Sequence, residues 1–415
     1  MEISPRARSV AILSLIASRF AYAFNWYDVG PVQVQIAQGY HTGLAEVSWA
    51  LVLFLMGVGL FQIPAGLLAH RWGPRAVSLW GLGLMGLSVV GGALSPWFPL
   101  FLAMRFLVGV GAALFFSPAI ALIAQYYPNT GRGFAVGIFN GAFNMGAGVA
   151  VFAAAVLVGY IGWEWTLIAG GILILALVAE NLFTLPTLPE PSHASSEMAR
   201  DAREVLSSGA LWALALGLVG FWTVSFAVPQ YLVPFLESAR GFAAPSAGAL
   251  DLVMVMTAFV GGPIGGVLVE RTRHPRWLLV VPTLVVAALT AAISLSPTLL
   301  LWPLAVGFGV LNGVVFAVLY VAVTRMPHFR RGSLALAIGL VNGVQVFLGS
   351  LLLLVGAYFF FGAGAYVAGW YYLGAVAAVT LALLAWGSAL PERPAAAAGR
   401  RGPTGDPGTG PDSPA

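Results

Sequence analysis

The chain has 415 residues, of which 60% are hydrophobic and only 8% are charged. Water-soluble domains carry about 25% charged residues, so this composition excludes a soluble globular protein. The formal net charge of +4 comes from arginines scattered in short loops, since the chain has no lysine, and nucleic acid is not an expected partner. Cysteine is also absent, which excludes disulfides and thiolate metal sites.

Apolar runs recur along the whole chain, and a run of about 20 residues is long enough to cross the ~30 Å hydrocarbon core as a helix. Breaks at glycine, proline and charged residues divide the runs into twelve predicted spans. The sequence therefore predicts an all-α membrane protein with twelve transmembrane helices. The spans are expected at 9–36, 45–69, 76–95, 98–125, 133–160, 163–185, 209–236, 245–270, 277–296, 298–325, 332–360 and 364–390.

The longest polar interval follows the sixth span and divides the chain into two halves. Its second part, EMARDAREVL, is expected to form a short amphipathic helix on the membrane surface. The Pro/Gly-rich end of the chain is typical of a disordered segment. The expected domains are an N-terminal six-helix bundle (1–185), a cytoplasmic linker (186–208), a C-terminal six-helix bundle (209–390) and a disordered cytoplasmic tail (391–415).

The arginines predict the orientation of the chain. With a cytoplasmic N-terminus, all but three of the nineteen lie in cytoplasmic segments. Arg240 lies in an outer loop, while Arg19 and Arg105 lie inside spans. Cytoplasmic loops carry an excess of Lys and Arg, so we expect both termini inside and a multi-pass protein of the cell membrane.

Two pairs of segments indicate an internal repeat. AVGIFNG (135–141) matches AIGLVNG (337–343), and GLLAHRWGPR (66–75) is similar to GVLVERTRHPR (266–276). Each pair is six spans apart, as duplication of a six-helix unit requires. Halves related in this way form transporters whose binding site lies at their interface.

The first of these loops carries a family resemblance. GLLAHRWGPR resembles the Major Facilitator Superfamily signature G-x-L-a-D-R-x-G-x-R, with His70 at the acidic position. In that family the loop acts as a conformational latch, and its acid pairs with basic groups at helix ends. Either the latch is weaker here, or Glu270 in the second half takes the acidic role. The resemblance assigns the latch to Gly66, His70, Arg71, Gly73, Arg75 and Glu270.

Two further segments extend the resemblance. RFLVGVGAA (105–113) is similar to the family signature R-x-x-x-G-x-G-x-A in span four. NGAFNMGAG (140–148) resembles the nitrate/nitrite porter signature, with Phe143 in place of its middle glycine. That branch also has an arginine in span two, where this chain has Gln62. The resemblance implies the superfamily fold and leaves the substrate open.

Asp28 and Arg105 are predicted to form an ion pair. Asp28 lies eight residues from the outer end of span one, and Arg105 seven from the outer end of span four. Both are therefore ~10–12 Å deep from the same side at 1.5 Å per residue. A carboxylate that loses its pair on protonation is the chemistry that proton coupling needs. The alternative is a static structural pair.

Arg19 lies nine residues before Asp28, so their side chains point to opposite sides of one helix. Arg19 therefore cannot pair with Asp28. An unpaired guanidinium near the midplane is suited to a carboxylate or oxyanion, which favours an anionic substrate. The alternative is that Arg19 snorkels or binds backbone carbonyls.

Other polar and aromatic side chains recur at helical spacing inside the spans. They are candidates for the substrate site, or for hydrogen bonds between helices. With Arg19, the predicted substrate-binding residues are Asn25, Asn140, Asn144, Trp222, Asn312, Tyr320, Asn342 and Gln345.

The predicted function is a secondary active transporter that moves a small anion, coupled to protons or by exchange. The alternative is a proton-coupled efflux pump for lipophilic compounds. No phosphate loop and no metal or catalytic cluster occurs in the sequence, so neither an enzyme nor a cofactor is expected. The expected partners are a small-molecule substrate, the lipid bilayer and, if Asp28 titrates, protons; we expect a monomer.

Overall fold

The structure is a computed structural model that describes residues 4–127, 132–187, 195–272, 275–324 and 331–386. Within these ranges every regular element is a helix. The elements are α1 (Pro5–Tyr27), η1 (Gly30–Val32), α2 (Gln33–Gly39), α3 (Leu44–Trp72), α4 (Pro74–Ala93), α5 (Phe98–Tyr126), α6 (Arg132–Thr184), α7 (Ser195–Leu206), α8 (Gly209–Gly217), α9 (Val219–Arg240), α10 (Ala244–Arg271), α11 (Pro275–Ala292), α12 (Thr298–Thr324), α13 (Arg331–Gly356), η2 (Ala357–Phe361) and α14 (Tyr366–Trp386).

Twelve membrane crossings can be traced through these helices. Ten stretches are long and apolar enough to cross a membrane, and a shorter apolar helix covers Arg276–Ala292. The stretch in α6 contributes two crossings, because Gly162 breaks the helix with φ 78° and ψ 168°. A positive φ is strained for residues with a Cβ, so the glycine marks this turn. The predicted fold class is confirmed.

The first predicted span, 9–36, is not one helix. α1 ends at Tyr27, and η1 and α2 complete the crossing. Pro31 lies within the first turn of η1, where its missing N–H costs no helical hydrogen bond. The break places Asp28 at the C-terminal end of α1, where the helix no longer continues.

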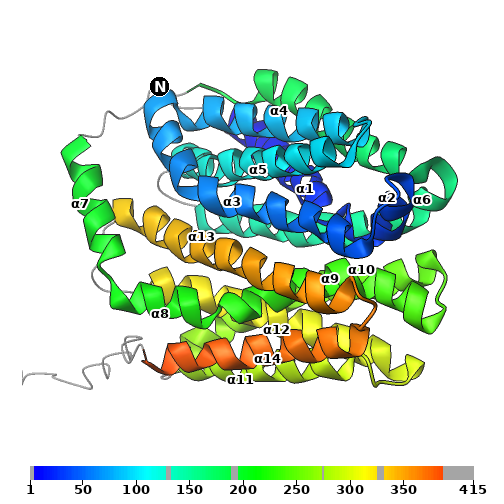
Figure 1. The fold of residues 1–415 in the computed structure, drawn as a ribbon. Helices are drawn as coiled ribbons and strands as arrows, with labels where there is room; N and C mark the ends of the chain where they lie inside the picture. The colour runs from blue at the N-terminus through cyan, green and yellow to red at the C-terminus, as the bar shows by residue number, and fades with distance from the viewer. Residues whose placement is uncertain (1–3, 128–131, 188–194, 273–274, 325–330, 387–415) are drawn as a thin grey trace, which may run out of the picture.

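The helices form two halves that meet at a central interface (Figure 1). In the first half α1 packs against α6, and α5 packs against α3 and α4. In the second half α10 packs against α12, and α11 and α9 pack against α14. Between the halves, α3 contacts α13 and α6 contacts α10. α7 includes the predicted surface helix and runs beside the bundle at one end (Figure 1).

Glycines bring one helix pair in each half into backbone contact. A Cβ on Gly109 of α5 would lie 1.9 Å from the carbonyl oxygen of Phe54 in α3. In the second half, a Cβ on Gly309 of α12 would lie 2.0 Å from the carbonyl oxygen of Met254 in α10. Small residues at such crossings let membrane helices approach closely. The close approach of α3 is therefore the physical reason for a glycine at position 109, the first glycine of the RFLVGVGAA segment.

Candidate substrate cavity and membrane charges

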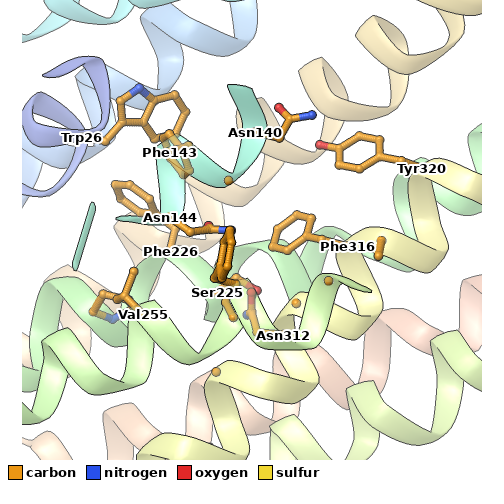
Figure 2. Close-up of a pocket in the computed structure, with 18 of the residues that line it drawn as sticks. Trp26, Asn140, Phe143, Asn144, Ser225, Phe226, Val255, Asn312, Phe316 and Tyr320 are labelled. Carbon is orange, nitrogen blue, oxygen red and sulfur yellow. The ribbon is translucent and has the colours of Figure 1, made fainter. Parts of the chain in front are cut away.

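A cavity of about 650 Å³ lies between the two halves. Side chains of α1, α3, α5 and α6 line it from the first half, and those of α9, α10, α12 and α13 from the second (Figure 2). The lining is mostly apolar and aromatic, with a few amides, hydroxyls and one guanidinium. Such a lining with few polar groups is typical of small-molecule sites.

The cavity gathers seven of the nine predicted substrate-binding side chains. Asn140 and Asn144 of α6 line it from the first half, and Asn312 and Tyr320 of α12 line it from the second (Figure 2). The Asn312 Nδ2 donates a hydrogen bond of 2.6 Å to the Ser225 Oγ, so part of its polarity is used within the second half. The lining members are Arg19, Asn140, Asn144, Trp222, Asn312, Tyr320 and Asn342.

Asn25 and Gln345 are not among the residues that line the cavity. Asn25 is fully buried, and its Nδ2 donates to the carbonyl oxygen of Ala21 at 3.2 Å. Gln345 donates to the carbonyl oxygen of Leu214 at 3.3 Å. The Gln345 bond joins α13 to α8, which is the bonding between helices that the alternative interpretation expected, whereas the Asn25 bond lies within α1.

Arg19 lies at the cavity wall inside a cage of aromatic rings. Its Cζ is 4.5 Å from the ring centroid of Tyr22, 4.4 Å from Phe116, 5.3 Å from Phe139 and 4.5 Å from Phe143. Its Nε and Nη1 have no hydrogen-bond partner, and no described acid lies within 4.0 Å. The rings offset part of the cost of burying the cation, but they leave its Nε and Nη1 without a hydrogen-bond partner.

Asp28 and Arg105 lie together, as their depths predicted. The Arg105 Nη1 is 3.3 Å from the Asp28 Oδ1, and Nη2 donates to the carbonyl oxygen of Asn25 at 3.4 Å. The Asp28 Oδ2 and the Arg105 Nε have no partner, so the pair is not bidentate. Phe54 covers the guanidinium at 5.1 Å from its ring centroid. The role of the pair in coupling stays a prediction.

Sequence reasoning missed Asp251 of α10. This carboxyl group is fully buried, and neither of its oxygens has a hydrogen-bond partner among the described residues. An acid in the middle of the apolar run 245–270 was a visible signal, because intramembrane ionisable residues mark functional sites by default. Tyr22, Gln62 and Ser225 are polar lining residues that were also missing from the predicted site.

Hydrogen bonds join the halves on the side of the membrane opposite the N-terminus. The Gln33 Nε2 donates to the carbonyl oxygen of Gln230 at 2.9 Å, and the Gln230 Nε2 donates to that of Trp26 at 2.7 Å. The Tyr231 hydroxyl donates to the Ser48 Oγ at 3.0 Å. We call these five residues the far-side seal.

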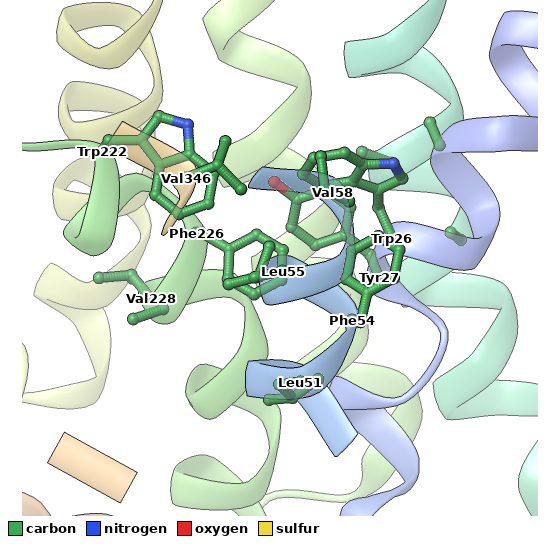
Figure 3. Close-up of a cluster of buried hydrophobic side chains, with 14 of the residues drawn as sticks. Trp26, Tyr27, Leu51, Phe54, Leu55, Val58, Trp222, Phe226, Val228 and Val346 are labelled. Carbon is green, nitrogen blue, oxygen red and sulfur yellow. The ribbon is translucent and has the colours of Figure 1, made fainter. Parts of the chain in front are cut away.

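Aromatic rings of the two halves pack together next to this seal, with Trp26, Tyr27 and Phe54 from the first half and Phe226 from the second (Figure 3). Trp26 packs edge-on against Phe54 at 4.9 Å and against Phe226 of the second half at 6.1 Å. Tyr27 lies 5.6 Å from Phe226. Trp26, Tyr27 and Phe226 also line the cavity, so they form its end wall on the far side.

The loop between α3 and α4 turns sharply at Gly73, whose φ is 85°. Arg71 is exposed beside Trp72, whereas Arg75 donates to the carbonyl oxygens of Leu185 and Leu182, both at 2.7 Å. Arg75 therefore holds the end of α6 within its own half. Gly66 has no atom within 4 Å of an added Cβ, and the side chains of His70 and Glu270 lie outside the described residues.

The model of the Major Facilitator Superfamily matches residues 15–352, which include every described residue that lines the cavity. A nitrite extrusion protein of Bacillus subtilis (strain 168) is 28% identical over 320 residues, 74% of this chain and 77% of that protein. A quinolone resistance transporter of Acinetobacter baumannii is 31% identical over 197 residues, 43% of each chain. The solved structure of a bacterial homolog to the human lysosomal transporter Spinster, inward-facing and occupied, is similar with a TM-score of 0.72 at 19% identity, and covers 94% of this chain and 97% of its own.

Proposed function

Because the chain belongs to the Major Facilitator Superfamily, we propose that it is a secondary active transporter that carries small organic anions by alternating access. Family membership makes it a multi-pass membrane transporter rather than an enzyme. The observation that supports an anion is Arg19, a buried cation on the cavity wall with no described acid beside it.

A guanidinium in this setting favours an anionic group. Charge-assisted hydrogen bonds from Arg to a carboxylate or oxyanion are about twice as strong as neutral ones, and they are often bidentate. The rings of Tyr22, Phe116 and Phe143 hold the Arg19 side chain in place, which lowers the entropy lost on binding. The similarity to a nitrite extrusion protein supports an anion as well.

The rest of the cavity favours an apolar body on that anion. A volume of about 650 Å³ is in the range of drug-sized ligands, far larger than nitrate or nitrite needs. Phe226 and Phe316 offer ring faces near the polar groups of Asn144 and Asn312 (Figure 2). An aromatic carboxylate such as benzoate matches this combination of one charge and one ring.

Efflux of uncharged lipophilic compounds is the second candidate. It is favoured by the predominantly apolar lining and by the similarity to a quinolone resistance transporter. The two candidates differ at Arg19, because a neutral lipophilic substrate does not need the guanidinium.

The proposed cycle follows from the orientation and the seal. With both termini cytoplasmic in the cell membrane, the far-side seal closes the outer side and the cavity faces the cytoplasm. The domains at 1–185 and 209–390 then rock about the cavity, with 186–208 as their linker and 391–415 as a cytoplasmic tail. Protonation of Asp28 releases Arg105, which couples the rearrangement to protons; the transporter works as a monomer.

Ligand-dependent thermal stabilisation of purified protein tests the substrate class. We expect benzoate to stabilise the wild-type protein, and Arg19→Gln to weaken benzoate binding about 10- to 100-fold, the worth of one charge-assisted hydrogen bond. Arg19→Lys is the matched control, which keeps the charge and is expected to retain part of the affinity. Stabilisation by neutral or cationic lipophilic compounds, with none by benzoate, nitrate or other anions, contradicts the proposal and favours efflux.

A further inference from the structure

Asp251 is a buried carboxyl group that the cycle above does not use. Its exposed fraction is 0%, and both side-chain oxygens are without a hydrogen-bond partner among the described residues. Among the described residues, no cationic group lies within 4.0 Å of the Asp251 carboxyl oxygens; the ion pair at that distance joins Arg105 and Asp28. An isolated carboxylate in an apolar interior is strongly disfavoured, so a group in this position exists in its neutral form.

The position of Asp251 connects it to the cavity. Met254 and Val255 lie three and four residues further along α10, and both line the cavity. Residues at these spacings share one helix face, so Asp251 continues the cavity-lining stripe by one turn towards the far side. Tyr27, which lines the end wall of the cavity, lies close enough to Asp251 for a negative charge on that carboxyl group to act on its hydroxyl. Asp251 itself is buried and is not among the residues that line the cavity.

Packing alone does not require an acid at this place. α3 begins at Leu44 and α10 at Ala244, and the two helices occupy equivalent places in the repeat. The residue of α3 that corresponds to Asp251 is Leu51, which is also fully buried. An apolar side chain thus fills the equivalent site in the first half, so the carboxyl group in the second half serves another purpose than packing.

We propose that Asp251 is a proton-binding site in the second half, and that it holds its proton while the far-side seal is closed. When the halves rearrange and water reaches the carboxyl group, its O–H bond breaks, the proton passes to water and a carboxylate remains. Reclosure of the seal requires that the proton be taken up again. This inference rests on the proposed transport cycle and adds a proton that the second half releases and regains on the far side to the titration of Asp28 in the first.

The described titratable groups near Asp251 are not placed to bind this proton in its stead. Tyr27 from α1 lies near it, and a phenol carries no charge at pH values well below 10. The other titratable side chains on the helices packed against α10 lie near helix ends or have another partner. Among the described residues they are Tyr231, Glu237 and Arg240 on α9, Tyr160, Glu164 and Glu180 on α6, Tyr320 on α12 and Arg276 on α11.

Infrared difference spectroscopy of the purified protein in lipid tests the protonation state directly. At neutral pH we expect a carbonyl-stretch band of a protonated carboxyl group that shifts in D₂O. Asp251→Asn is expected to abolish a component of this band that the matched variant Asp28→Asn retains. If the Asp251→Asn spectrum keeps the full band of the wild-type protein, the proposal is wrong.

Transport in proteoliposomes tests the coupling. The ratio of benzoate uptake with and without an inward proton gradient is expected to fall in Asp251→Asn but to stay above unity, because Asp28 still titrates. Benzoate counterflow is expected to persist, because exchange moves no net proton. An Asp251→Asn variant with the wild-type ratio overturns the proposal. Absence of benzoate counterflow in the wild-type protein contradicts the proposed substrate instead, and the infrared measurement then decides the protonation of Asp251 independently.

Discussion

Arg105 and Asp28 are almost completely buried, with exposed fractions of 2% and 1%, and their contact joins α5 to the end of α1. Arg19, on another face of α1, has no described acid within 4.0 Å and packs against aromatic rings instead. A buried pair contributes little net stability, but removing one partner leaves an uncompensated charge. Of these three buried charges, Asp28 and Arg105 therefore depend on each other, whereas Arg19 depends on the rings around it.

Substitutions of Asp28 and Arg105 distinguish a purely structural ion pair from one that breaks when Asp28 is protonated. Asp28→Asn leaves Arg105 without a counter-charge and is expected to destabilise the protein by about 3–5 kcal/mol. The double variant with Arg105→Gln removes both charges and should recover much of that loss. Thermal unfolding in detergent measures the stability, and uptake over a range of pH measures coupling. Proton-coupled uptake that is unchanged in the double variant would show that the pair is structural.

Helix packing depends on glycine where α3 crosses α5. The Phe54 carbonyl oxygen occupies the place of a side chain at Gly109, so the crossing tolerates no Cβ without a backbone shift. The same arrangement recurs where α10 crosses α12, at Gly309 and Met254. These two crossings hold the helices that carry Arg105 and Asp251, respectively, in register with the rest of each half.

Gly109→Ala is expected to destabilise the protein by at least the ~1–3 kcal/mol typical of overpacked cores. The matched control is Gly83→Ala in α4, where nothing lies within 4 Å of an added Cβ. That substitution should be neutral, or stabilising by up to ~1 kcal/mol through helix propensity. Thermal unfolding of the two variants side by side checks the difference, and equal midpoints would contradict the close approach.

At the scale of the whole molecule, the seal determines which side of the membrane reaches the cavity. Its side-chain donors are amides and one hydroxyl, and two of its three acceptors are backbone carbonyls. Each such bond contributes about 1 kcal/mol, so the closed state is favoured only modestly by them. Small changes here should shift the balance between conformations rather than unfold the protein.

Gln230→Ala removes the bond to the Trp26 carbonyl oxygen and is expected to raise the population of the open far side about fivefold. Because the chain has no cysteine, Val29→Cys provides a single thiol at a position that is buried while the seal is closed. The rate of its labelling by a membrane-impermeant maleimide reports the opening. Gln345→Ala, which loses a bond within one half, should leave this rate unchanged.

Much of the fold could be predicted from the sequence, because apolar length alone specifies a membrane helix. The proximity of Asp28 and Arg105 followed from their equal depth. The rotation of each helix about its own axis could not be predicted, and this is why Asn25 and Gln345 turn away from the cavity. The break after Tyr27 also escaped prediction, since Pro31 is compatible with both a bent and an interrupted helix.

The chemistry of the seal has a consequence for how the transporter can be regulated from outside. None of its five side chains changes charge between pH 5 and 8, and none forms an ion pair among the described residues. A change of pH or of salt on the far side therefore has no charge among these five side chains to act on. In the proposed cycle, opening is triggered through the occupant of the cavity or a proton already bound inside the bundle.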